Sequence, residues 1–344
     1  MSKLFYIPLE EYDRRYTADW VKQFEAEFNQ NNVNYETIFG EVVSSKINCG
    51  DVLDAYGTNM YKFSQLIQII QKIRDGEVND GDVIFFADGW FPGVESLQYI
   101  RNISKKDFKL ACVVHAGTWD PHDFTCRFGM RSWGKPLEES WFNFYDYVFV
   151  ATQFHKDLII SRLNISGDNI IVTGIPFYAE ELAKKYPTNN KENIIIFPHR
   201  CNEEKHPELF DAVAERYPQF RFIKSIEICD TRDKYFSLLA KAKVMLSFAD
   251  QETFGFSTVE AMALNNYVIV PDKLSYRETV PDEYRYSCLD SVCSEGDLEE
   301  VCRRIDYFVE NEDAILSTPV SKKYNTIFRY KDAIKNMLDK MGVV

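Results

Sequence analysis

The chain alternates between short apolar runs and longer amphipathic segments over most of its 344 residues. Short, continuous apolar runs predict buried strands, whereas apolar residues spaced three and four apart predict helices. In the first half we expect strands at 4–9, 34–40, 83–88, 110–115, 147–152 and 169–176. Helices are expected from about residue 17, where Trp20, Phe24 and Phe28 share one face, and at 60–74, around 97–100, and at 136–145 and 155–163.

The same pattern begins again after a charged, proline-containing stretch at 177–193, which we interpret as an interdomain connection. Strands are then expected at 193–198, 220–225, 243–248, 267–270 and 284–288, and helices at 206–218, 231–242, 257–264, 297–311 and 321–341. Regular strand–helix alternation predicts parallel sheets covered by helices on both faces. A chain of this length exceeds the usual size of a single core, so we predict two such α/β domains.

The charge and cysteine content narrow the function classes. The formal net charge is −13, which disfavours long-range attraction to nucleic acid or to anionic membranes but leaves room for a local basic groove. The eight cysteines form no CxxC pair, and we interpret them as reduced residues of a cytoplasmic protein. Cys288 and Cys293 lie closest together without a neighbouring His, so we expect no zinc site. There is no signal-peptide pattern and no apolar run of about 18 residues, so no membrane partner is expected.

Polar clusters follow the ends of several predicted strands, at 88–90, 115–120, 200–205 and 250–255. Ligands of open parallel sheets bind at the carboxyl ends of the strands. We therefore expect a binding or catalytic site formed by these loops. An NAD-dependent oxidoreductase is set aside because no G-x-G-x-x-G follows a strand.

The stretch from Phe248 to Pro271 carries the strongest chemical signal. It runs from a strand through a loop holding Glu252 into a helix holding Glu260, and then into another strand. Amides at a helix start attract phosphate, and carboxylates accept hydrogen bonds from sugar hydroxyls. The segment thus suits a phosphorylated, hydroxyl-rich ligand, although either Glu would also be compatible with a helix cap or an exposed helical position.

A second signal is the pair of cations Arg200 and Lys205, between a predicted strand and a predicted helix. Two cations beside a helix N-terminus would hold a diphosphate. The alternative is a solvated loop, since isolated charges are mostly exposed.

In combination, these features resemble the retaining glycosyltransferases of family 4, which have the two-domain GT-B fold. The resemblance is carried by Glu252-TFGFSTV-Glu260 followed by Ala-Met-Ala, by the spacing of Arg200 and Lys205, and by the segment VTGIP. It is clear over about 193–280. It implies two Rossmann-like parallel-sheet domains facing a cleft: an acceptor-binding domain at 1–176, a nucleotide-sugar-binding domain at 177–325, and a C-terminal helix at 326–344 that returns to the first domain. Tyr324, Phe328 and Ile334 would pack there.

The resemblance also implies roles for individual residues. Arg200 and Lys205 would neutralise the donor diphosphate, and Glu252, with the amides of Thr253, Phe254, Gly255 and Phe256, would face the donor sugar. Glu260 would accept from the ribose hydroxyls, and Ser257 and Thr258 would add phosphate contacts. The expected reaction is transfer with retention from a nucleotide sugar, with a UDP-sugar as the leading candidate and no metal or further cofactor required.

The sequence departs from the family at two places. The glycine-rich loop after the first strand is replaced by PLEEYDRRYTADW, in which Arg14, Arg15 and Tyr16 are bulky. Asn265 and Asn266 replace the glycines that follow the Ala-Met-Ala segment, and asparagine is the next best residue for a left-handed turn.

In the first domain, the resemblance makes His115 a catalytic residue together with Glu252. The alternative for His115 is a loop histidine that hydrogen-bonds the backbone. Asp88 and Asp120 are candidates to orient an acceptor hydroxyl, but they are also compatible with capping. Trp90 and Trp119, in the same loops, are further acceptor-binding candidates.

The segment 125–135 interleaves cations with aromatic residues: Arg127, Arg131 and Lys135 alternate with Phe128 and Trp133. Such a pattern suits phosphate backbones and stacked bases; the alternative is a surface loop with two core anchors. The compact chain also resembles bacteriophage glycosyltransferases, which implies a hydroxymethylated base in duplex DNA as the favoured acceptor. A saccharide, lipid or small-molecule acceptor, and a non-catalytic nucleotide-sugar-binding protein, stay open as alternatives, and the sequence predicts no oligomeric state.

Overall fold

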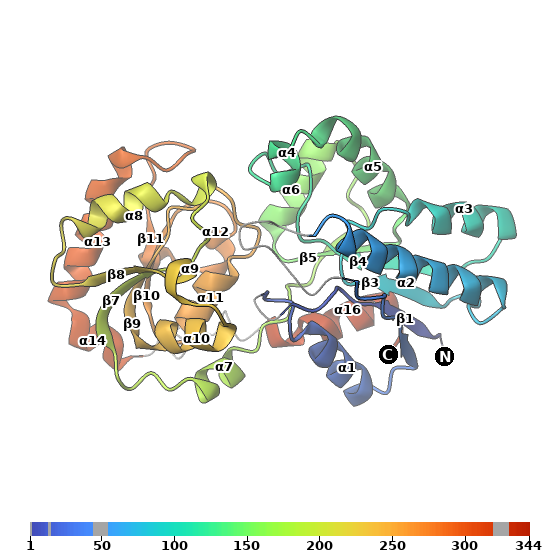
Figure 1. The fold of residues 1–344 in the computed structure, drawn as a ribbon, viewed down its shortest axis with the longest axis horizontal. Helices are drawn as coiled ribbons and strands as arrows, with labels where there is room; N and C mark the ends of the chain where they lie inside the picture. The colour runs from blue at the N-terminus through green and yellow to red at the C-terminus, as the bar shows by residue number, and fades with distance from the viewer. Residues whose placement is uncertain (1, 13–14, 44–53, 319–329) are drawn as a thin grey trace. The chain divides into compact units, whose positions relative to one another are not determined.

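The computed structural model describes residues 2–12, 15–43, 54–318 and 330–344. The chain divides into two compact units, which are coloured along the chain in Figure 1. Unit 1 comprises Met1–Pro176 and Asp332–Val344, and unit 2 comprises Phe177–Lys331. The C-terminal helix α16 (Ala333–Met341) belongs to unit 1, where it contacts helix α1 (Trp20–Gln30) and buries Ile334. Tyr324 and Phe328 lie outside the described residues.

Unit 1 contains a six-stranded sheet in the order β2-β1-β3-β4-β5-β6, with all pairs parallel. Its strands are β1 (Leu4–Ile7), β2 (Tyr35–Thr37), β3 (Val83–Phe86), β4 (Lys109–Val113), β5 (Tyr147–Val150) and β6 (Ile170–Val172). Its other helices are α2 (Gly57–Arg74), α3 (Glu95–Ser104), α4 (Phe124–Arg127), α5 (Arg131–Phe144) and α6 (Gln153–Leu163).

Alternating side chains explain how helices cover both faces of this sheet, since neighbours along a strand point to opposite faces. On one face, Tyr6 stacks on Phe24 of α1 with ring centroids 5.2 Å apart. On the other face, Phe5 and Ile7 belong to a core shared with Leu66 of α2. Figure 1 shows α1 and α2 on opposite sides of the strands.

Unit 2 contains a five-stranded parallel sheet in the order β11-β10-β9-β7-β8. Its strands are β7 (Glu192–Phe197), β8 (Arg221–Lys224), β9 (Ala242–Leu246), β10 (Tyr267–Pro271) and β11 (Arg285–Tyr286). Its helices are α7 (Ala179–Lys185), α8 (Pro207–Ala214), α9 (Ser225–Ile228), α10 (Arg232–Lys241), α11 (Phe256–Ala263), α12 (Tyr276–Thr279), α13 (Leu298–Glu310) and α14 (Glu312–Ser317), with short 3₁₀ turns η1 (Glu203–Lys205), η2 (Asp282–Tyr284) and η3 (Glu295–Asp297).

The predicted fold class, two parallel-sheet α/β units, is confirmed. The expected linker at 177–193 contains a helix, α7, that the sequence interpretation missed. Its sequence AEELAKK consists mostly of good helix formers, with acidic residues in the first turn and lysines in the last. The helix also contacts α11, so it is part of the packed unit. Within the described residues, no helix combines the length and apolarity needed to cross a membrane.

Candidate functional site

A buried ion pair joins two loops at the carboxyl end of the unit 2 sheet. Lys205 ends the turn η1 after β7, and Glu252 lies in the loop after the neighbouring strand β9. Lys205 Nζ donates to Glu252 Oε1 at 2.9 Å and also to the Gln251 carbonyl. The Lys205 side chain is 6% exposed and that of Glu252 18%, so the pair sits at the edge of solvent with the carboxylate outermost. The structure thus brings together two residues that the sequence places 47 positions apart.

Asp250 connects these two loops through hydrogen bonds. Its amide donates to the Glu204 carbonyl at 2.9 Å, and its Oδ2 lies 2.6 Å from Nε2 of His206, a residue with a left-handed backbone (φ 52°). Its other oxygen accepts from Lys273 and from the Cys293 amide. Partial burial lowers the pKa of His206, but Asp250 and Glu208 outweigh it and raise the pKa above the ordinary value. Because Asp250 ties both loops, the position of Lys205 against Glu252 is fixed before any ligand binds.

The site also contains a buried histidine that the sequence interpretation did not single out. His199 Nε2 lies 2.8 Å from Ser247 Oγ, and its Nδ1 lies 3.7 Å from Glu252 Oε1 and 3.5 Å from Ser257 Oγ. Burial, together with the charges of Lys205 and Arg200, holds the pKa of His199 well below its ordinary value. His199 is therefore neutral at physiological pH. Its place directly after the apolar strand and Pro198 is the one sequence signal that was available.

Helix α11 begins where the sequence predicts a phosphate-binding turn. Gly255 precedes it with φ 83°, and a Cβ at this position would lie 3.1 Å from the Tyr276 ring. A helix start leaves its first N–H groups without intrahelical acceptors, which favours an anion. Phe254 is buried, with its ring 4.7 Å from that of Tyr330. Thr258 is completely buried, and the phosphate contact expected of its hydroxyl stays a prediction.

Glu260, in the middle of α11, is a buried carboxylate. Tyr235 Oη donates to its Oε2 at 3.1 Å, and Arg232 lies 4.0 Å from its Oε1. Burial raises the pKa of Glu260 to about 7, despite the lowering influence of Arg232 and Tyr235. At neutral pH this side chain is thus able to accept or to donate a hydrogen bond.

Arg200 differs from Lys205 in being exposed. Its guanidinium is half exposed and lies 3.9 Å from the buried carboxylate of Glu204. The loop after β7 therefore supplies one fixed cation, Lys205, and one cation that reaches into solvent.

In unit 1, His115 has the geometry of the alternative weighed for it, a histidine held by local hydrogen bonds. Its Nε2 lies 2.7 Å from the Ala87 carbonyl, which only accepts, so Nε2 carries the proton. Its Nδ1 then accepts from Tyr16 Oη at 2.7 Å. Burial lowers the pKa of His115, in spite of Asp88. Both ring nitrogens are thus engaged, which leaves neither available for the expected catalytic role without rearrangement.

Asp88 and Trp90 lie together after β3. Asp88 pairs with Lys62 of α2 at 2.7 Å, and the same Lys62 donates to the Trp90 carbonyl at 2.6 Å. Trp90 Nε1 donates to Glu138 Oε1 at 3.0 Å. Burial opposes the ionisation of Asp88, but Lys62 and His115 lower its pKa below the ordinary value.

Two of the expected acceptor-binding residues, Trp119 and Asp120, are buried. Trp119 is buried, with its ring centroid 5.5 Å from that of Phe142, so in this structure it lies in the core of unit 1. Asp120 is also buried, and its Oδ1 accepts from the His122 amide at 2.9 Å within a local turn. Both belong to the loop after β4, which folds inward onto the core.

The segment 125–135 forms an exposed surface on α4 and α5. Phe128 is 75% exposed and Trp133 48%, so the alternative in which these rings are core anchors is wrong. Arg127 and Arg131 are exposed beside them. The structure therefore keeps the cations and the aromatic rings of this segment on the surface.

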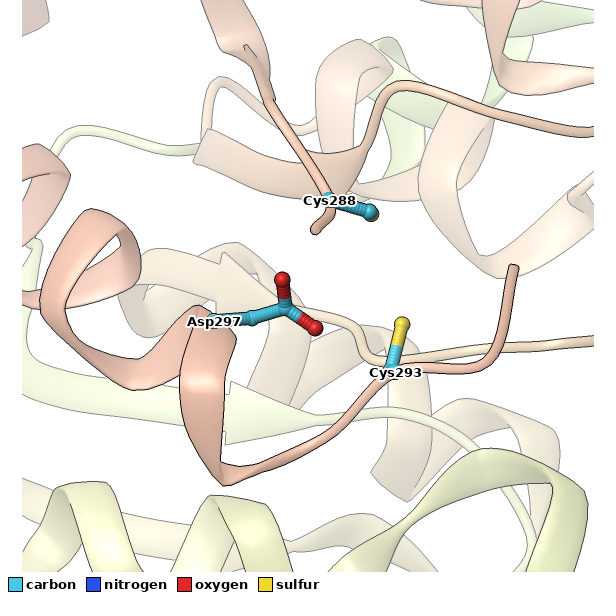
Figure 2. Close-up of side chains that lie close together, drawn as sticks. All are labelled: Cys288, Cys293 and Asp297. Atoms are coloured by element: carbon cyan, nitrogen blue, oxygen red, sulfur yellow. The ribbon is translucent and has the colours of Figure 1, made fainter. Parts of the chain in front are cut away.

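A cluster of two thiols and a carboxylate lies in the segment that follows β11 and ends in the turn η3. Among the described residues, Cys288, Cys293 and Asp297 form the one group of three possible metal ligands, with the ligand atoms within 4.8 Å of one another. Figure 2 shows the Asp297 carboxylate directed between the two cysteines. Both carboxylate oxygens already accept backbone N–H groups, from Leu289 and Ser294 at 2.9 Å each. A capping role for η3 therefore accounts for Asp297, which the sequence interpretation had not connected to the cysteines.

No family model matches the chain. Comparison of folds finds sucrose-phosphate synthase from Thermosynechococcus elongatus (11% identity, TM-score 0.63, 100% of this chain and 97% of that chain). It also finds HepE of Anabaena in complex with UDP and glucose (11% identity, TM-score 0.61, 99% of this chain and 100% of that chain). A third similar structure is the catalytic domain of starch synthase IV from Arabidopsis thaliana bound to ADP and acarbose (10% identity, TM-score 0.65, 98% of this chain and 99% of that chain). Against the GtfA/B complex (15% identity, TM-score 0.52), the match covers 81% of this chain but only 61% of the other.

At such low identity the likeness concerns the fold. Two parallel-sheet α/β units, with six and five strands, correspond to those of glycosyltransferases over nearly the whole length of this chain. This chain has the GT-B glycosyltransferase fold.

Proposed function

We propose that the protein is a glycosyltransferase that binds a nucleotide sugar in unit 2 and transfers the sugar to an acceptor hydroxyl bound by unit 1. The observation that carries this proposal is the Lys205–Glu252 pair beside the start of α11. A fixed cation, a carboxylate and helix-start amides at one sheet edge match the needs of a diphosphate joined to a sugar. The GT-B fold supports the same reading.

In the proposed site, Lys205, Arg200 and the first amides of α11 hold the diphosphate. Cleavage of the bond between sugar and phosphate places charge on the leaving diphosphate, and preorganised donors in a partly dry site stabilise that charge. Lysine carries three donor hydrogens, so Lys205 is able to bind phosphate while it keeps Glu252 in position. Glu252 then accepts from hydroxyls of the donor sugar, and Glu260 from those of the ribose.

A UDP-sugar is the donor proposed first, because HepE has been solved with UDP and with UDP-glucose. Starch synthase IV has been solved with ADP, which makes an ADP-sugar the next donor to test. We further propose that the cations of the chain replace a metal and that the reaction retains the anomeric configuration, as the E-x7-E resemblance implies. The configuration of the product is read directly from the anomeric proton coupling by NMR.

The experiment that tests the proposal measures nucleoside diphosphate released from a panel of UDP-, ADP- and GDP-sugars. Lys205→Ala and Glu252→Ala are expected to lower the rate by about a hundredfold or more, in the range seen when one preorganised donor is removed. Lys241→Ala, an exposed cation of the same unit, is the matched control. Full activity in either site variant contradicts the proposal. Donor binding by the wild type without any turnover supports the non-catalytic alternative instead.

One observation supports the acceptor that the sequence favours, a hydroxymethylated base in duplex DNA. Exposed cations and exposed aromatic rings lie together at 127–133, where Phe128 and Trp133 could stack on bases. Binding of duplex DNA over a salt series tests this candidate, with Arg127→Ala and Arg131→Ala expected to reduce the salt dependence. Absence of affinity at low salt, or unchanged affinity in both variants, contradicts it.

A further inference from the structure

Two thiols of unit 2, Cys288 and Cys293, are joined by a loop of four residues, 289–292, all of which are exposed. Cys288 is partly buried and Cys293 is buried. Their sulfur atoms lie within 4.8 Å of each other. Figure 2 shows the Cys293 thiol directed toward the chain segment that carries Cys288.

The backbone around this pair is free to adjust. Residues 287–294 form neither helix nor strand. A disulfide requires its two sulfur atoms about 2 Å apart, so a local movement of the loop is enough to close the bond. The pair is therefore placed for thiol–disulfide exchange.

The two thiols are suited to different steps of such an exchange. The Cys293 thiol beside it lowers the pKa of Cys288, and although burial opposes this, Lys273 lowers it further. Because the thiolate is the nucleophile, Cys288, which solvent also reaches, is the thiol that attacks first. The neighbouring Cys288 and burial raise the pKa of Cys293, so Cys293 keeps its proton until the second step.

Two hydrogen-bond routes lead from Cys293 into the loop after β9, which carries Glu252. The Cys293 amide donates to Asp250 Oδ1 at 2.9 Å. The Cys293 sulfur lies 3.5 Å from Tyr286 Oη, which donates to the Ser247 carbonyl at 3.2 Å. A shift of Cys293 therefore changes the contacts that position this loop.

Lys273 connects the four-residue loop itself to Asp250. Its Nζ donates to Asp250 Oδ1 and also to the Ser291 carbonyl, the latter at 3.0 Å. Closing the disulfide moves Ser291 and Cys293 together, so it disturbs both groups that donate to this oxygen. The Asp250 amide also holds the turn η1 through the Glu204 carbonyl at 2.9 Å. The disturbance thus reaches both loops of the candidate donor site.

We propose that Cys288 and Cys293 form a reversible disulfide that loosens the loops at 200–206 and 250–255. The co-reactant is a small-molecule disulfide such as oxidised glutathione. The effect on donor binding rests on the function proposed above, whereas the disulfide and its effect on the loops do not.

The exchange has two steps. The Cys288 thiolate attacks one sulfur of the small disulfide, which breaks its S–S bond, forms a mixed disulfide and releases one small thiolate. Cys293 then loses its proton and attacks Cys288 Sγ, which releases the second small thiolate. Two protein thiols are thereby oxidised to one disulfide. The small disulfide is reduced to two thiols, which take up the two protons that the cysteines lose.

Thiol trapping on the full chain tests whether the disulfide forms. After incubation with oxidised glutathione, free thiols are alkylated and the tryptic peptide 286–303, which also holds Cys302, is analysed by mass spectrometry. A Cys288–Cys293 bond is expected in most molecules and is expected to disappear after reduced glutathione. Cys201→Ser, which changes an exposed cysteine elsewhere in unit 2, is the control and is expected to keep the bond. No bond, a bond to Cys302, or a mixed disulfide that persists overturns the inference.

Hydrogen–deuterium exchange tests the coupling without any ligand. The amides of Lys205, His206 and Asp250 donate to backbone carbonyls of the two loops. In the oxidised protein these amides are expected to exchange at least about threefold faster, because the contacts of Asp250 are loosened. The amides of α2 in unit 1 serve as the reference and are expected to be unchanged. Equal exchange in the oxidised and reduced loops overturns the inference even if the disulfide forms.

Titration with UDP-glucose separates this inference from the proposed function. Oxidation is expected to weaken binding by about tenfold in the wild type. Cys288→Ser is expected to bind like the reduced wild type before and after oxidised glutathione. Equal binding by the oxidised and reduced wild type overturns the effect on the donor site. If the reduced wild type binds no nucleotide sugar, the transferase proposal fails while the disulfide and the loosened loops stand.

Discussion

Lys205 Nζ lies 2.9 Å from Glu252 Oε1, and the two side chains are 6% and 18% exposed. An ion pair at this depth differs from a surface pair, because removal of one partner leaves a charge that water does not fully solvate. The pair is also the centre of the proposed donor site, so its contribution to stability and its contribution to binding have to be separated.

A double-mutant cycle separates them for stability. Lys205→Met is expected to lower the free energy of unfolding by about 3 kcal/mol, since Glu252 is left without its cation. Adding Glu252→Gln is expected to recover part of that loss, which is a coupling of the kind found between contacting residues. Lys234→Met, which removes an exposed pair with Asp230, is the control and is expected to change stability by less than about 1 kcal/mol. Urea unfolding is measured for the wild type, the two single site variants Lys205→Met and Glu252→Gln, the double variant and the control. Additive effects of the two site substitutions would contradict the expected coupling.

The raised pKa of Glu260 predicts a pH dependence of stability. Burial raises this pKa to about 7 in the folded protein, above the value of about 4.3 in an unfolded chain. Between these values the folded state binds more protons than the unfolded state, so this group makes stability fall as pH rises from about 4.5 to 7. The Glu260→Gln variant has no carboxyl group to ionise at this position, so it does not lose this stability as pH rises. Relative to wild type, the variant is expected to gain stability progressively from pH 5 to 8, by roughly 3 kcal/mol at most.

Thermal or urea unfolding of both proteins at pH 5, 6, 7 and 8 measures this difference directly. The comparison of variant with wild type cancels the titration of other groups. A difference that is constant with pH would show that Glu260 has an ordinary pKa.

Gly255 and Gly76 allow backbone strain to be distinguished from a steric clash. Both have a left-handed backbone, with φ 83° and 80°, but only Gly255 has a neighbour that an added Cβ would meet, the Tyr276 ring at 3.1 Å. Gly76→Ala is expected to cost about 1 kcal/mol from the backbone alone. Gly255→Ala is expected to cost more, since Tyr276 is buried and has to shift. If urea unfolding shows the same loss of unfolding free energy in both variants, the Tyr276 ring moves aside without an energetic cost.

The Cys288–Cys293–Asp297 cluster gives a prediction about metal. Because both Asp297 oxygens accept backbone N–H groups, Asp297→Ala is expected to destabilise the fold by about 2 kcal/mol through lost capping. For the same reason, a chelator such as EDTA is expected to leave the melting temperature of the wild type unchanged. A melting temperature that falls with EDTA and recovers with zinc would instead assign the cluster as a metal site.

The periodic parts of the fold were predictable because hydrophobic spacing determines them locally. Trp20, Phe24 and Phe28 mark the buried face of α1, and the buried strands follow the apolar runs. Helix α7 was missed because charge and a nearby proline in 177–193 resemble a linker, whereas its packing against α11 depends on residues far along the chain.

The candidate site was predictable only where local sequence and topology act together. Glu252 and Lys205 follow adjacent parallel strands, and that adjacency brings them into contact. Trp119 and Asp120 also follow a strand, but their loop folds into the core. Glu10 and Glu11 are neighbours of one residue type, of which one is buried and the other exposed. Only tertiary packing around the end of β1 decides between them.

Donor binding by the Lys205 variant tests the central claim most directly. Isothermal titration of UDP-glucose, and of ADP-glucose if the first is silent, compares wild type with Lys205→Met after circular dichroism has shown that both are folded. The account predicts binding to the wild type and a loss of at least about a hundredfold in the variant, because a fixed cation at the diphosphate is removed. Equal affinity in the two proteins, or no affinity of the wild type for any nucleotide sugar, would contradict it.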